Sequence, residues 1–182
     1  MDVTLETERL QMRMFKEADF DTFASILADP EVMTFLGEGV PIPRDDAWRR
    51  FAFLIGHWHL RGYGMWAVEE QASGRVAGHV GVFNPEGWPE LEVGWTLHRD
   101  FQGKGYATEA GAAAMDWCFE ELGREKVSSV IRPGNERSIR VAEKLGETFE
   151  REVTIQNHPC LIYSISRETV SYTHLRAHET SG

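Results

Sequence analysis

The sequence predicts a single α/β domain in which strands and helices alternate along most of the chain. Two periodicities support this. Leu10, Met12 and Met14 recur every second residue, as in a half-buried strand, whereas the apolar residues of 18–27 recur at helical spacing. With 182 residues, of which 42% are hydrophobic, the chain is long enough for one compact core and too short to argue for two domains.

A second helix is expected over residues 45–61, because Pro43 precedes this range and Gly62 follows it. The side chains expected to be buried on this helix are Trp48, Phe51, Ala52 and Ile55. Between the two helices, residues 30–43 are expected to be irregular.

The remaining elements follow from turn signals and from the two periodicities. Strands are expected over 64–69 and 75–83, joined by a hairpin turn at 72–74, with a third strand after the turn at 85–87. The second half of the chain is expected to form, in order, a long helix over 106–122, a strand over 126–131, a short helix starting near Asn135, and two final strands over 149–155 and 160–167.

A glycine-containing loop, Gln102-Gly-Lys-Gly-Tyr-Ala107, stands between the strand-like run 91–97 and the long helix. The unpaired amides at a helix N-terminus and the positive end of the helix dipole together attract phosphate oxygens. The loop therefore predicts a ligand that carries a pyrophosphate.

Two common nucleotide-binding motifs do not fit this loop. A dinucleotide fingerprint requires a third small residue where this chain has Thr108. A P-loop requires Ser or Thr after Gly-Lys, but here Lys104 is followed by Gly105.

The loop does resemble the Gln/Arg-x-x-Gly-x-Gly/Ala signature of the GCN5-related N-acetyltransferases (GNAT). A second segment is similar to that family's other cofactor motif, since Asn135-x-x-Ser138 opens a short helix that ends at Gly146. The runs 7–13 and 92–95 resemble the ribosomal-protein (RimJ/RimL-like) branch in particular. The resemblance covers roughly residues 5–169.

The resemblance implies an acyl-CoA N-acyltransferase fold. That fold is a mixed, mostly antiparallel sheet of about six to seven strands, flanked by about four helices and splayed next to the cofactor loop. The acetyltransferase domain would span 1–169, and 170–182 would be a disordered or non-native tail. The implied co-substrate is acetyl-CoA, with no metal. The residues implied to bind it are Trp95, Leu97, Gln102, Gly103, Lys104, Gly105, Tyr106, Ala107, Asn135 and Ser138.

Glu92 is the candidate general base, because it occupies the strand position where several family members carry a glutamate that acts through water. Its alternative role is a solvated strand carboxylate. Gly94 follows on the same face, where a bulge and close packing are both open.

Ser138 is the candidate proton donor to the departing thiolate. The family often has a tyrosine four residues after this serine, but this chain has Ala142. A serine that only caps the helix, and donation by solvent, remain alternatives. Another departure is Glu147, where the family usually has phenylalanine, and Phe149 is expected to fill that pocket.

Composition and net charge indicate which classes of binding partner to expect. The net charge, 19 − 29 = −10, argues against nucleic-acid binding and mildly favours a cationic acceptor. Lys104, Arg132, Arg137 and Arg140 are expected to reverse this field locally for an anionic cofactor. Without a long apolar run or a leader, the expected location is cytoplasmic, with no membrane partner. Cys118 and Cys160 are expected to be buried rather than disulfide-bonded.

The acceptor amine is not fixed by the sequence. The preferred interpretation is an N-acetyltransferase that acts on a protein or peptide N-terminus. A small-molecule amine, such as a polyamine, an amino acid or an antibiotic, is the close alternative. A non-catalytic acyl-CoA-binding module and a phosphate-binding interaction domain are the rival classes, and both a monomer and a homodimer are open.

Overall fold

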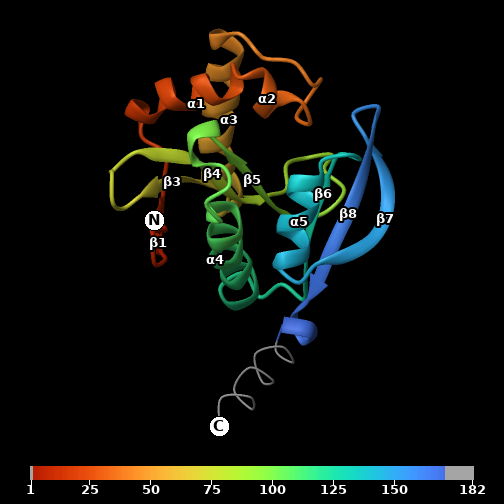
Figure 1. Ribbon diagram of the computed structural model, residues 1–182. Coiled ribbons are helices and arrows are strands. Elements are labelled where there is room, and N and C mark those ends of the chain that lie inside the picture. The colour runs from red at the N-terminus through yellow and green to blue at the C-terminus, as the bar shows by residue number, and fades with distance from the viewer. Residues whose placement is uncertain (1, 171–182) are drawn as a thin grey trace.

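A computed structural model describes residues 2–170 of the protein, so the expectations for 171–182 lie outside the described residues (Figure 1). Its described part contains one eight-stranded sheet with the strand order β1-β2-β3-β4-β5-β6-β8-β7. The strands are β1 (Leu5–Glu6), β2 (Leu10–Arg13), β3 (Met65–Glu70), β4 (Val76–Phe83), β5 (Glu92–Leu97), β6 (Lys126–Ile131), β7 (Thr148–Ile155) and β8 (His158–Ser166).

The helices gather in two groups beside this sheet. They are α1 (Phe20–Leu27), α2 (Pro30–Met33), α3 (Arg44–Arg61), α4 (Tyr106–Glu120) and α5 (Glu136–Lys144), with short 3-10 turns at Glu17–Asp19 and Arg99–Phe101. Figure 1 shows α1, α2 and α3 together at one end and α4 beside α5 in front of the sheet. One apolar cluster packs α4 on the sheet, and a second packs α1 and α3 around Met65 of β3.

The predicted fold class is confirmed: the sheet is mixed, mostly antiparallel and open. It has one strand more than the upper expected number. The neighbours β5 and β6 are parallel and share a single aligned pair, Glu92 with Ser128. The two strands therefore separate beyond this pair, which is the expected splay.

The expectation that residues 30–43 are irregular is wrong for their first four residues, which form α2. The Asp29 side chain accepts a hydrogen bond of 2.9 Å from the Glu31 amide, and Pro30 occupies the first helical position. An acidic N-cap followed by proline is a helix-start signal that the sequence reading did not use.

The predicted buried face of α3 is also wrong, except at Phe51. Trp48 is 47% exposed and Ile55 is 38% exposed, and Ala52 is exposed as well. The buried apolar stripe is Ala47, Phe51, Leu54 and Trp58, at helical spacings of four, three and four. The solvent-exposed face of α3 also carries the aromatic residues Trp48 and Phe53, so the buried stripe does not stand out in the sequence.

No helix in the described range 2–170 has the length and apolar character that a membrane crossing requires.

Leu54→Ala and Leu60→Ala form a matched pair on α3, because Leu54 is buried and Leu60 is 84% exposed. We expect Leu54→Ala to lower the free energy of unfolding by about 2–5 kcal/mol, from lost burial and a cavity. Leu60→Ala should change it by less than about 0.5 kcal/mol. Urea unfolding measures both, and equal effects would contradict the assigned face.

Candidate active site

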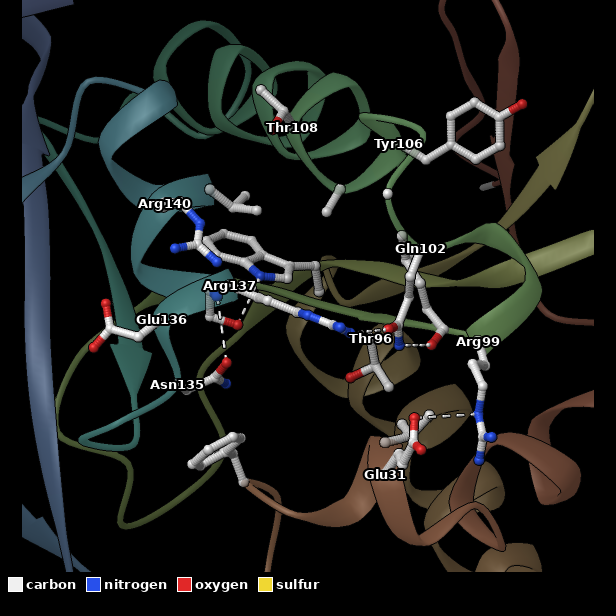
Figure 2. A pocket seen from close by; sticks show the side chains of 18 of the residues that line it. Glu31, Thr96, Arg99, Gln102, Tyr106, Thr108, Asn135, Glu136, Arg137 and Arg140 are labelled. Carbon is white, nitrogen blue, oxygen red and sulfur yellow. Dashed lines mark hydrogen bonds and ion pairs between the residues drawn. The ribbon is translucent and has the colours of Figure 1, made fainter.

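The splay between β5 and β6 opens into a cleft of about 980 Å³. Figure 2 shows its walls: the glycine loop and α4 on one side, the start of α5 on another, and α2 with the segment after it opposite. The cofactor-binding candidates that line it are Trp95, Leu97, Gln102, Gly103, Gly105, Tyr106, Ala107, Asn135 and Ser138. The structure thus brings nine of the ten candidates to one cleft.

The glycine loop turns sharply into α4. Gly103 and Gly105 have φ values of +77° and +81°, in the region that favours glycine, and Gly105 is the residue immediately before the helix. The first amides of α4 have no intrahelical acceptor and lie at the cleft. This arrangement suits the oxygens of a pyrophosphate.

Gln102 connects the loop to both walls of the splay. Its Nε2 donates to the Leu97 carbonyl at 3.1 Å, and its Oε1 accepts from Nη1 of Arg137 at 2.8 Å (Figure 2). Because both ends of the amide are engaged, Gln102 fixes the end of β5 relative to α5.

Ser138 lies in the first turn of α5, at the splay. Its amide donates to Oδ1 of Asn135 at 3.3 Å, and its Oγ accepts a hydrogen bond from Nε1 of Trp95, also at 3.3 Å. The indole therefore uses a lone pair of the hydroxyl and leaves its proton available for donation.

Glu92 is buried beside the cleft and does not line it. Its side chain is only 9% exposed, and Oε2 has no hydrogen-bond partner among residues 2–170. The interpretation as a solvated strand carboxylate is therefore wrong. Burial raises the pKa of Glu92 to about 8, with the Trp88 side chain and the Val130 backbone opposing the shift.

Gly94 makes room for this carboxyl. The β4–β5 register runs without a bulge, so close packing, the second alternative, explains the glycine. A Cβ at this position would lie 3.2 Å from Cε of Met65 and 3.3 Å from Oε1 of Glu92.

The comparison with known proteins agrees with this cleft. Residues 9–148 match the family model described as an acetyltransferase (GNAT) domain. The chain belongs to the GNAT family. It is 33% identical over 167 residues to an uncharacterised Bacillus subtilis protein, YkkB, covering 87% of this chain and 93% of that one. An acetyltransferase structure from Agrobacterium tumefaciens superposes with a TM-score of 0.82 at 32% identity, covering 91% and 95%.

Other GNAT relatives differ in their acceptors. A putative ribosomal N-acetyltransferase, YdaF of Bacillus subtilis, is 36% identical over 42% of this chain and 45% of its own. A spermidine N(1)-acetyltransferase of Escherichia coli is 32% identical over 46% of each chain. The RimL ribosomal L7/L12 acetyltransferase, solved with coenzyme A, shares the fold, with a TM-score of 0.74 at 18% identity over 90% and 98% of the chains. The protein is thus an acetyl-CoA-dependent N-acetyltransferase, and its resemblance to the RimJ/RimL-like branch is supported by YdaF over less than half of the chain and by the fold of RimL.

In this GNAT chain the N-terminal segment forms hydrogen bonds with the glycine loop and with the start of α4. Arg9 donates from Nη1 to the Lys104 carbonyl at 2.9 Å and from Nε to Glu109 at 2.7 Å. Thr7 Oγ1 donates to the same carboxylate at 2.6 Å. Although burial would raise it, these bonds lower the pKa of Glu109. Arg9 belongs to the run 7–13, but its pairing with Glu109, 100 residues away, has no local sequence signal.

Only two of the four cations expected at the cofactor line the cleft, namely Arg137 and Arg140. The Lys104 Nζ instead lies 3.7 Å from Glu70 and 5.0 Å from the centroid of Phe101. Arg132 donates to the carbonyl of Gly37. The Lys104 side chain, the tenth cofactor candidate, thus points elsewhere.

Glu147 is the buried group whose role sequence analysis missed. It is 2% exposed, and burial raises its pKa to about 8, with the Ser129 hydrogen bond opposing this shift and the charge of Glu92 adding to it. Phe149, expected to fill this pocket, is 53% exposed. The sequence contains a signal for this buried acid, since Glu147 replaces the phenylalanine that is usual after Gly146.

The cysteines are free and buried as predicted, and burial raises the pKa of Cys118 to about 12.

Gly105→Glu should weaken acetyl-CoA binding at least tenfold, or about 1.4 kcal/mol. The substitution places a side chain and a negative charge where φ is +81° and the amides face the cleft. Isothermal titration calorimetry measures the dissociation constant. Gly74→Glu is the control, because φ is +67° there in a turn that does not line the cleft. Equal binding by the two variants would remove the loop from the site.

Proposed function

We propose that this enzyme acetylates the N-terminal α-amine of a protein or peptide, by direct attack of the amine on the acetyl-CoA thioester in a ternary complex. The observation that carries the proposal is the splay itself. The glycine loop and Ser138 line the cleft, and the buried carboxyl of Glu92 belongs to the residue at which β5 and β6 separate, which together support the proposal.

The cofactor would bind mainly through backbone. The amides of the glycine loop and of the first turn of α4 would hold the pyrophosphate, while Arg137 and Arg140 offset its charge. The pantetheine arm would follow β5 at Trp95 and Leu97, where the separation from β6 leaves backbone groups without a partner strand. Lys104 would contribute its amide alone.

Proton affinity favours an α-amine as the acceptor. At pH 7, neutralising an α-amine costs about 1.4 kcal/mol and a lysine amine about 4.6 kcal/mol, at about 1.36 kcal/mol per pKa unit. The pKa of Glu92, raised to about 8, is close to that of an α-ammonium. Proton transfer between the two is then nearly balanced, which is the condition for effective general-base catalysis.

Because Glu92 does not line the cleft, the proton would reach it through water. Ser138 would then give its hydroxyl proton to the thiolate of coenzyme A and take a replacement proton from water, while Glu92 releases the proton of the amine to water. Its Oγ is oriented by Trp95, and its own hydrogen is free for the departing sulfur.

A small polyamine is the second candidate acceptor. It is favoured by the spermidine N(1)-acetyltransferase relative and by the net charge of −10. The Glu31 carboxylate on α2 lies at the cleft, opposite the glycine loop, and would have to exchange its ion pair with Arg99, at 3.5 Å, for an ammonium group (Figure 2).

A direct test compares thiol release from acetyl-CoA across three acceptors. These are a peptide with a free N-terminus and no lysine, the same peptide blocked at its N-terminus but carrying a lysine, and spermidine. We expect the first to give the highest kcat/KM. A higher value for spermidine would select the polyamine, and no turnover with any of the three would contradict both.

Glu92→Gln should lower kcat by about 10²–10⁴-fold while the acetyl-CoA dissociation constant stays within about twofold. Wild-type kcat/KM should rise with pH towards 8, because the carboxylate form grows in that direction. An acceptor amine of pKa about 5 stays neutral throughout and separates this titration from that of the acceptor. Glu90→Gln, on the same chain segment, is the control. Full activity of Glu92→Gln at pH 7 would sink the base assignment.

Ser138→Ala should lower kcat by about 10-fold or more with little change in acetyl-CoA affinity, because proton donation to the thiolate acts in the transition state. Ser138→Cys keeps a hydrogen-bond donor and should recover part of the rate. If Ser138→Ala instead loses affinity at unchanged kcat, the residue has a binding role.

A further inference from the structure

The structure contains a second buried carboxyl beside the proposed base. Glu147 comes directly after α5 and is 2% exposed. Its charge and that of Glu92 interact, and each side chain has an Oε2 atom without a hydrogen-bond partner in the part of the chain that the structure describes. If both were ionised, the two buried carboxylates would repel each other and would lose their hydration.

No cation compensates the pair within residues 2–170. Lys126, at the start of β6, is held by Glu90 and Glu150, with both contacts at 3.0 Å. Arg132, at the other end of β6, donates to the carbonyl of Gly37. Within the described residues, the thiol of Cys160 on β8 also interacts with Glu92. Its pKa is raised, mainly by burial; Arg132 opposes this shift and Glu92 adds to it.

The hydrogen bonds of Ser129 indicate which carboxyl holds a proton. Ser129 Oγ lies 2.8 Å from the carbonyl oxygen of Val93 and 3.1 Å from Oε1 of Glu147. A carbonyl can only accept, so the single hydroxyl proton goes to Val93. At its other contact Oγ can then accept from a protonated Glu147, which gives each contact its own hydrogen, whereas an ionised Glu147 would have to share that one hydrogen with the Val93 carbonyl. The chain Glu147 to Ser129 to Val93 ends on the backbone next to Glu92.

We propose that Glu147 stays protonated in the working enzyme and acts as a positioning residue for Glu92. Resting on the proposed function, this inference assigns the negative charge of the pair to Glu92, the member beside the cleft. Through Ser129, Glu147 holds β5 at Val93, at the point where β6 begins to separate from it. During turnover the proton from the ammonium goes to Glu92, and Glu147 keeps its own.

The pH dependence of unfolding tests the protonation state without using activity. The pKa of Glu147 is about 4.5 in the unfolded chain and about 8 in the folded protein. Between these two pH values the unfolded chain releases the proton more readily, so the free energy of unfolding falls as the pH rises. Wild-type unfolding free energy, measured by urea titration between pH 5 and 9, should therefore decline with pH. Glu147→Gln, which mimics the neutral acid, should decline less steeply.

Glu109→Gln is the matched control, because the pKa of Glu109 is lowered. A lowered pKa gives stability that is already present above the unfolded pKa, so this variant should lose stability at pH 7 and keep the wild-type slope between pH 6 and 9. If Glu147→Gln leaves the wild-type slope unaltered, Glu147 is ionised and the inference is overturned.

Kinetics test the positioning role. Glu147→Gln keeps a donor to Ser129 and should lower kcat by less than about threefold, whereas Glu147→Met, of similar volume without a donor, should lower it by about tenfold or more. Ser129→Ala should match the methionine variant. The KM for acetyl-CoA should stay within about twofold in all three. Equal kcat in Glu147→Gln and Glu147→Met would reduce Glu147 to packing.

The two proposals fail in distinguishable ways. Full activity of Glu92→Gln removes the base and the positioning role with it, whatever Glu147 does. Normal dependence on Glu92, together with an unaltered unfolding slope in Glu147→Gln, overturns only the protonated Glu147. If Glu147→Met does not fold, Ser129→Ala and the unfolding series still decide.

Discussion

The active site depends on one constraint, the single aligned pair between β5 and β6. Every other neighbouring pair of strands in the sheet is antiparallel, whereas these two meet in parallel at Glu92 and Ser128 and then diverge. A sheet that closed here would pair the edge of β5 and leave no space for a pantetheine chain. The ladder is thus interrupted where we propose that the thioester lies, and the interruption leaves backbone groups unpaired that a ligand can satisfy.

The divergence has to be held from both sides, because two strands that could pair tend to do so. On one side Gln102 connects the end of β5 to Arg137 of α5. On the other, Arg9 fixes the glycine loop through the Lys104 carbonyl and through Glu109. At the point of separation, Ser129 bonds the Val93 carbonyl. Polar contacts at the gap therefore replace the missing ladder bonds.

Local signals predicted most helices and strands, and the resemblance that two short motifs carry predicted the sheet, because these signals lie within short segments. The glycines of the loop, the Asn135 cap and the strand over 126–131 are each visible within a few residues. The predicted buried face of α3 was wrong, since Trp48, Ala52 and Ile55 are apolar but packing leaves them exposed. The pairing of Arg9 with Glu109, and of Glu147 with Ser129, joins distant segments, and no local pattern encodes such contacts.

The two acids buried where β5 and β6 separate have opposite effects on stability and on the proposed catalysis as the pH changes. Glu92 and Glu147 both have pKa values raised to about 8, so both favour the folded state most at acidic pH, and this contribution fades as the pH rises. The amine, however, is neutral, and Glu92 ionised, only on the alkaline side of that range. With Glu147 protonated, as we propose, the one negative charge of the pair stays on Glu92, and the repulsion between two carboxylates is avoided. The polar contacts around the splay then hold the sheet in the pH range where its buried acids support it least.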